Sequence, residues 1–147
     1  MKRKNTGFTL VEIMTVMGIV ATLVSLAVVG AVNFKKQANE SNCQANLKGI
    51  AAGFEVYAAR NSLMYAPSEQ SSLQFLLDDG CLNQDLTTMP QLANFRYIVA
   101  SANPSGYDIR AIAVNPALSG HNYQIVTGGL LRRSDTPQPS DADFKYF

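Results

Sequence analysis

Few side chains in this chain have the types and spacing that covalent or acid–base chemistry requires. His121 is the sole histidine among 147 residues, which excludes a metal site with two histidine ligands. Cys43, Cys81 and His121 match no zinc-binding spacing, and no serine lies in a nucleophile-elbow motif that would place it in a triad with His121. We therefore predict no enzymatic activity, no catalytic residue, no metal site and no cofactor, and we expect His121 in a loop or at a strand edge.

Three aspartates near the C-terminus are a second group with possible chemistry. Asp135, Asp141 and Asp143 carry the oxygen atoms that calcium prefers, but no EF-hand pattern surrounds them. The segment from Ser134 to Ser140 is rich in proline and serine, which favours a solvated strap that ends in Phe144, Tyr146 and Phe147. Calcium binding by these aspartates is left open beside the prediction of no metal site.

The most specific pattern is a junction near the N-terminus. Three basic residues at positions 2–4 lead to Gly7, which is followed by Phe8-Thr9-Leu10-Val11-Glu12 and then by twenty uncharged residues, 13–32. At about 1.5 Å per residue those twenty residues reach about 30 Å, the thickness of a bilayer core, and the basic residues hold the N-terminus in the cytoplasm. A secretory signal is cut after its apolar region, whereas the glycine here precedes it. Cutting at Gly7 keeps the membrane helix.

Glu12 is an acidic residue near the end of this apolar span. A carboxylate at mid-bilayer costs about 2.5 to 3.5 kcal/mol, and less near the interface, so such a residue usually has a partner. Cutting at Gly7 creates an α-amino group on Phe8, which is a cation near neutral pH. We expect this amine to pair with Glu12, either within one helix or between neighbouring copies.

The segment Gly7-Phe8-Thr9-Leu10-Val11-Glu12, with its basic leader and apolar helix, resembles the class III signal of type IV pilins and type II secretion pseudopilins. The resemblance is close over roughly residues 1–32. It implies that a membrane-embedded prepilin peptidase cuts after Gly7 and methylates Phe8, and that Glu12 neutralises the N-terminus of a neighbouring subunit during assembly. It also implies partners: other copies of the chain, other pilins and an inner-membrane platform protein. The expected location is the inner membrane, with the domain outside, and then a surface pilus or periplasmic pseudopilus.

One departure from many major pilins concerns a proline late in the apolar helix. This chain has Val29 and Gly30 there, and its first proline is Pro67. Proline removes a backbone hydrogen bond and kinks a helix, whereas glycine weakens it by about 1 kcal/mol relative to alanine. Partial melting of the helix in a filament is therefore less strongly indicated here than in pilins that carry the proline. This leaves open a role as a minor subunit instead of the main shaft component.

Composition and charge agree with a small exported domain on a membrane helix. We expect a leader over residues 1–7, a membrane and assembly helix over 8–32, and one periplasmic or extracellular domain over 33–147. Loss of the three basic leader residues leaves nine basic and eleven acidic residues, or a net charge near −2. That balance indicates no nucleic-acid partner.

The helix is predicted to continue from Phe8 to Arg60. Beyond the membrane segment, apolar residues recur at spacings of four, three, four and three, which defines one helical face: Cys43, Leu47, Ile50, Phe54 and Tyr57. Ala51 and Ala58 widen this stripe, and charged residues fall elsewhere. We interpret the stripe as core packing.

The remainder predicts a short helix and a sheet. Ser68, or Ser71 and Ser72, can cap a helix over Leu73–Leu77, and Gly80 is a stop signal. Strand-like runs follow: Phe95–Ser101, Tyr107–Val114, Tyr123–Thr127 and Leu130–Arg133. Gly128-Gly129 fits a two-residue hairpin turn. We therefore predict an α+β fold, a long helix packed on a small antiparallel sheet of three to four strands.

Two cysteines in an exported chain suggest a disulfide between Cys43 and Cys81, which would clip the connection to the long helix. Two small buried thiols are the alternative.

The function that we predict is a structural subunit of a type IV pilus or type II secretion pseudopilus. The alternative is a minor or tip pilin that acts in adhesion, DNA uptake or substrate binding. A membrane-tethered enzyme is disfavoured by the missing site residues.

Overall fold

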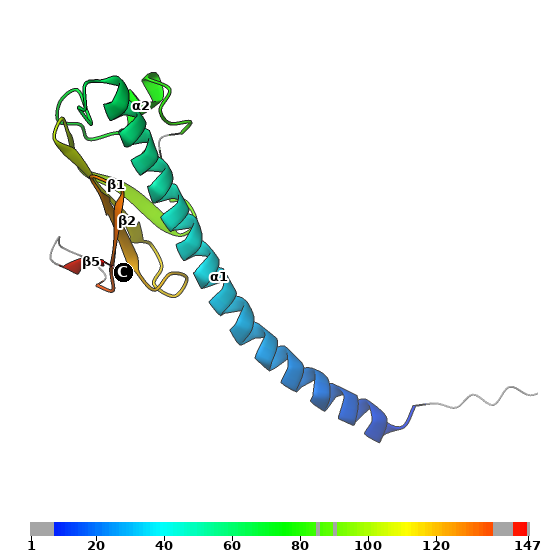
Figure 1. Ribbon diagram of the computed structural model, residues 1–147. Helices are drawn as coiled ribbons and strands as arrows, with labels where there is room; N and C mark the ends of the chain where they lie inside the picture. Colours follow the sequence, from blue (N-terminus) through cyan, green and yellow to red (C-terminus); the bar gives the residue numbers. More distant parts are fainter. Residues whose placement is uncertain (1–7, 85, 90, 137–142, 147) are drawn as a thin grey trace, which may run out of the picture. The chain divides into compact units, whose positions relative to one another are not determined.

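The computed structural model describes residues 8–84, 86–89, 91–136 and 143–146 (Figure 1). The chain divides into two compact units, and the boundary lies between Lys35 and Lys36. In the first unit the structure describes the apolar N-terminal part of one long helix. Every residue of the hydrophobic core, from Cys43 to Phe144, belongs to the second unit.

Helix α1 spans Leu10–Arg60, close to the predicted bounds. No proline interrupts it, since the first one is Pro67. It ends where the Leu63 N–H donates to the Ala58 carbonyl at 2.8 Å and Ser62 adopts a left-handed conformation with φ 56°. This geometry satisfies carbonyls that the helix end would leave without partners.

Helix α2, Gln74–Asp78, is one turn long and lies one residue later than predicted. Its N-cap is Leu73, and no side chain caps it among the described residues, so the expected serine cap is wrong. Burial holds the turn in place, because Leu73 and Leu76 are both fully buried. The stop at Gly80 is confirmed by its φ of 67°.

The second unit contains one antiparallel sheet with the strand order β1-β2-β3-β4-β5. The strands are β1 Phe95–Asn103, β2 Gly106–Ala113, β3 Asn122–Val126, β4 Leu130–Ser134 and β5 Lys145–Tyr146.

The turn between β3 and β4 contains the predicted Gly128-Gly129 pair but is one residue longer than predicted, because Val126 pairs with Leu130 and Thr127 belongs to the turn. Gly128 and Gly129 have φ angles of 82° and 70°, which glycine adopts without strain. The predicted α+β fold is thus confirmed, with one addition at the C-terminus. There Arg132 pairs with Tyr146 and Arg133 with Lys145, so the tail forms a two-residue fifth strand that was not predicted. Most of the predicted strap, residues 137–140, lies outside the described residues.

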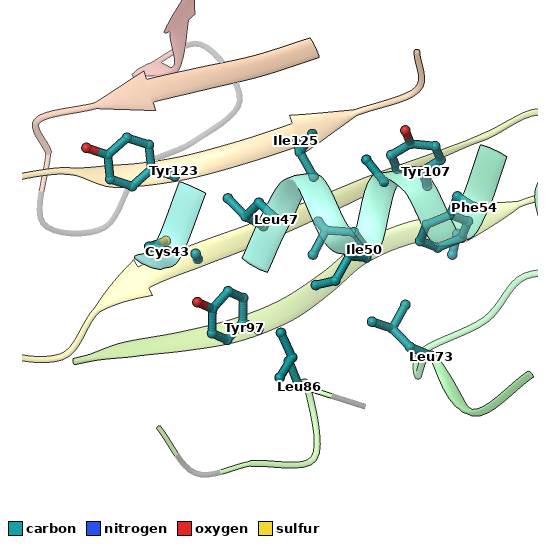
Figure 2. Packing of buried hydrophobic residues seen from close by; sticks show 14 of the residues in the cluster. Cys43, Leu47, Ile50, Phe54, Leu73, Leu86, Tyr97, Tyr107, Tyr123 and Ile125 are labelled. Atoms are coloured by element: carbon teal, nitrogen blue, oxygen red, sulfur yellow. The ribbon is translucent and has the colours of Figure 1, made fainter. Parts of the chain in front are cut away.

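The part of α1 that follows Lys36 lies along one face of β1 and β2 (Figure 1). Leu47, Ile50 and Phe54 are fully buried, and they point toward sheet residues such as Tyr107 and Ile125 (Figure 2). The Phe54 and Tyr107 rings stack, with centroids 4.3 Å apart and an interplanar angle of 12°. The predicted apolar stripe is therefore the helix side of the core.

Candidate functional site: the apolar N-terminal helix and Glu12

The first unit exposes apolar side chains throughout the part that the structure describes. Leu10 is 76% exposed, Leu26 74% and Phe34 73%, although these residues would be buried in an ordinary core. An 18-residue window of α1 has a mean hydropathy of 2.3, and none of it is buried within the chain. By length and composition this helix is able to cross a membrane. Apolar surface of this extent marks a segment that is covered by lipid or by other protein.

Thr9 and Glu12 form hydrogen bonds with each other at the start of this helix. The Thr9 N–H and the Thr9 hydroxyl each donate to Glu12 Oε2 at 2.8 Å, and the Glu12 N–H donates to Thr9 Oγ1 at 3.2 Å. This reciprocal arrangement is a capping box, which satisfies two N–H groups that a helix start leaves without partners. The Glu12 carboxylate therefore has two hydrogen-bond donors within its own chain.

Thr9 was not among the residues predicted to contact Glu12. The signal was present, because threonine followed three residues later by glutamate ahead of an apolar run is the capping-box pattern. Phe8, the expected new N-terminal residue and methylation site, directly precedes Thr9 and is 85% exposed. Gly7 lies outside the described residues.

The comparisons with known proteins agree with this geometry. The family model for the prokaryotic N-terminal methylation motif matches residues 2–30. The type II secretion system core protein G of Dickeya chrysanthemi is 30% identical over 129 residues, which cover 88% of this chain and 72% of that protein. The protein of the same name from Pseudomonas aeruginosa is 30% identical over 128 residues, with 87% and 78% covered. No solved structure gives a significant match.

The chain belongs to the pilin and pseudopilin family. This membership confirms the predicted function as a structural subunit of a pilus or pseudopilus. Proteins of this family are structural and not typically enzymes.

The two cysteines of this family member do not form the predicted disulfide in the structure, where both are free thiols. A Cβ atom added to Gly53 would lie 3.1 Å from the Cys81 carbonyl oxygen, so the segment that follows α2 crosses α1 at Gly53. Gly53 is ten residues beyond Cys43, or about 15 Å along the helix, whereas the Cα atoms of a disulfide lie within about 7 Å.

The environments of the two thiols also differ. Cys43 is fully buried, and burial raises its pKa to about 12. Cys81 is partly exposed, and its Sγ lies 3.3 Å from Asp79 Oδ2 and 3.7 Å from a guanidinium nitrogen of Arg60. Burial, followed by the hydrogen bond to Asp79, raises the pKa of the Cys81 thiol as well. Both groups are therefore weak nucleophiles in the folded domain.

His121 directly precedes β3, which confirms its predicted place in a loop or at a strand edge. Within the described part of the chain, no three His, Cys, Asp or Glu side chains are arranged to hold a metal ion. Of the aspartates considered for calcium, Asp135 lies 3.4 Å from His121 Nε2, and Asp141 falls outside the described residues.

Proposed function

We propose that this chain is the main shaft subunit of a type II secretion pseudopilus, in which the apolar helices of many copies pack together. The observation that supports this most directly is the exposure of apolar side chains around the whole first part of α1, together with Glu12 at its start. The names of its relatives favour a pseudopilus over a pilus, since both are type II secretion system core proteins.

The proposed route to the filament begins with processing of the leader. Residues 1–7 are removed by a prepilin peptidase, and Phe8 becomes the methylated N-terminus. Residues 8–32 then hold the subunit in the inner membrane, with the N-terminus in the cytoplasm and residues 33–147 outside. An inner-membrane platform protein passes each subunit to the growing filament, and the chain itself performs no enzymatic reaction.

Glu12 has a different partner before and after assembly in this proposal. In the single subunit its carboxylate accepts two hydrogen bonds from Thr9, which offset part of the cost of a carboxylate near lipid. Both donors are uncharged, so these bonds supply no counter-charge. The α-amino group of Phe8 on a neighbouring subunit supplies that counter-charge, so the gain appears on joining the filament.

The test is the substitution Glu12→Ala in cells that carry the secretion system, with Glu69→Ala as the matched control. Glu69 is exposed, and it lies in the connection after α1 rather than in the apolar helix. We expect the Glu12 variant to be cleaved, stable and membrane-bound but to form few or no filaments, whereas the Glu69 variant forms normal numbers. Normal filament numbers in the Glu12 variant would refute the pairing role.

The alternative role is a minor or tip subunit, for which the absence of a proline before Pro67 leaves room. Quantitative mass spectrometry of sheared filaments distinguishes the two roles. A shaft subunit accounts for most of the filament mass, whereas a tip subunit is present in a few copies.

A further inference from the structure

Glu40 on α1 connects three groups at one end of the sheet. Its Oε1 accepts the Gly120 N–H at 2.7 Å and lies 3.1 Å from His121 Nδ1, and its Oε2 accepts the Tyr123 hydroxyl at 3.3 Å. Gly120 and His121 belong to the segment between β2 and β3, residues 114–121, which we call the β2–β3 loop. The Glu40 side chain is 17% exposed, so these bonds are partly shielded from water.

The other nitrogen of the same imidazole also faces a carboxylate. His121 Nε2 lies 3.4 Å from Asp135 Oδ1, just after β4. The ring therefore lies between Glu40 on the helix and Asp135 beside the sheet. The Asp135 side chain is 74% exposed, so its contact is the weaker of the two.

The number of hydrogen bonds that the ring can donate depends on its protonation state. A neutral imidazole has one N–H donor and one lone pair, whereas the imidazolium has two donors. Because carboxylates only accept hydrogen bonds, both contacts are satisfied when the ring carries two protons. We propose that protonated His121 is a pH-dependent clamp, which holds the β2–β3 loop against α1 by bridging Glu40 and Asp135.

Three other charged or titratable groups lie around the ring, and two of them are cations. A Cβ on Gly120 would lie 2.7 Å from Lys36 Nζ, so an ammonium group faces the loop from α1, and Arg133 Nε lies 3.8 Å from Asp135 Oδ1. These two cations oppose a positive ring, whereas the two carboxylates in direct contact favour it. Burial raises the pKa of Tyr123 to about 12, so its hydroxyl stays a donor to Glu40 throughout the range in which histidine titrates.

The clamp has a defined pH window. Carboxyl side chains are ionised above about pH 4 to 5, and histidine changes charge between about pH 5 and 8. The stabilisation from the clamp is therefore present in the lower part of that range and is lost as the pH rises and the ring loses a proton. A pocket of about 60 Å³, lined by His121, Asp135 and Ser119 among others, has room for water through which the ring can exchange protons.

A second set of bonds holds the far side of the loop without any titratable group. The Asn94 side-chain amide donates to the Asn115 carbonyl at 2.8 Å and to Ser119 Oγ at 2.9 Å. The Asn115 N–H donates back to Asn94 Oδ1 at 3.1 Å. On the α1 side, the Asn39 side-chain amide donates to the Leu118 carbonyl at 3.0 Å. Loss of the clamp thus loosens only the end of the loop at Gly120 and His121, and the rest stays attached.

The experiment uses the full chain, labelled with ¹⁵N, in detergent micelles. Because His121 is the sole histidine, all imidazole nitrogen signals belong to it. We expect both ring nitrogens to be protonated at pH 5.5, and we expect the Gly120 amide to exchange about two- to fivefold more slowly at pH 5.5 than at pH 8 after correction for intrinsic exchange. A neutral ring at pH 5.5 would overturn the proposal without any variant.

Two variants separate the clamp from general stability. His121→Gln removes the ionisable ring and should abolish the corrected pH dependence at Gly120, and Asp135→Asn should reduce it but leave part of it. Exchange at Asn115, which Asn94 holds, is the internal control and should not change. The same pH dependence at Gly120 in the wild-type chain and in His121→Gln would refute the clamp. The inference depends on the geometry around Glu40 and not on the proposed filament, so failure of one leaves the other intact.

Discussion

Phe54 is the residue through which α1 and the sheet can be tested most directly. It is fully buried, it stacks on Tyr107 with centroids 4.3 Å apart, and the edge of Phe75 lies against it at 5.9 Å. Phe54→Ala removes the ring from both contacts and leaves a cavity. Substitutions of this kind cost about 3 to 5 kcal/mol, and the two aromatic pairs place Phe54 in the upper part of that range.

This cost is large relative to the stability of a small domain, which is about 5 to 15 kcal/mol. The second unit has about 110 residues, for which 1 kcal/mol shifts the melting temperature by about 3 to 6 °C. We therefore expect Phe54→Ala to lower the melting temperature by about 12 to 24 °C. Circular dichroism of a fragment from Lys36 onward measures this change, because that unit holds the whole core.

Val56 provides the matched control on the same helix. It lies two residues further along α1, is 42% exposed and lies outside the core cluster. Val56→Ala should change the free energy of unfolding by less than about 0.5 kcal/mol. Phe54→Leu, which keeps most of the volume, should cost about 1 to 2 kcal/mol and remain measurable if the alanine variant does not fold. Equal melting temperatures for Phe54→Ala and Val56→Ala would refute the assignment of Phe54 as the central contact.

Three further predictions follow from other parts of the chain. Gly7→Val should leave the full-length precursor in the membrane, and Edman sequencing of wild-type filaments that began at Met1 would contradict cleavage after Gly7. Labelling with iodoacetamide at pH 8 should modify Cys81 faster than Cys43, because Cys43 is fully buried and its raised pKa keeps it a neutral thiol. A protein mass two units lower under non-reducing conditions would instead show a disulfide. Gly106→Ala should destabilise the domain by about 1 to 3 kcal/mol, because the new Cβ would clash with Thr127 Oγ1, which accepts the Tyr107 N–H. A chemical denaturation midpoint equal to that of the wild type would exclude the clash.

The elements of this fold were predictable because their signals are local in the sequence. The stripe through Leu47, Ile50 and Phe54 repeats every three to four residues, and the Gly128-Gly129 turn needs two residues with positive φ. Strand β5 gave no such signal, because two residues are too few for an alternating pattern. It exists through its pairing with Arg132 and Arg133.

The interactions that sequence patterns missed join residues that are far apart in the chain. Glu40 and Glu55 lie off the core stripe, and no sequence pattern indicated a partner for either. In the structure Glu40 accepts the N–H of Gly120, eighty residues later, and Glu55 accepts the hydroxyl of Tyr107, fifty-two residues later. The separation of the two free thiols in the structure has the same origin, because the position at which the segment after α2 crosses α1 depends on tertiary packing at Gly53.

Glu12 shows how a local device and an assembly contact can share one side chain. Thr9 satisfies the hydrogen-bonding geometry of the carboxylate and starts the helix, but a threonine carries no charge. Near lipid, the remaining cost is that of the negative charge, which a hydrogen-bond donor reduces and a cation can neutralise. In the proposed assembly, a subunit capped in this way is held in the membrane and gains free energy when a neighbouring amine pairs with Glu12. The capping box and the proposed assembly contact are thus compatible, because one supplies hydrogen bonds and the other supplies charge.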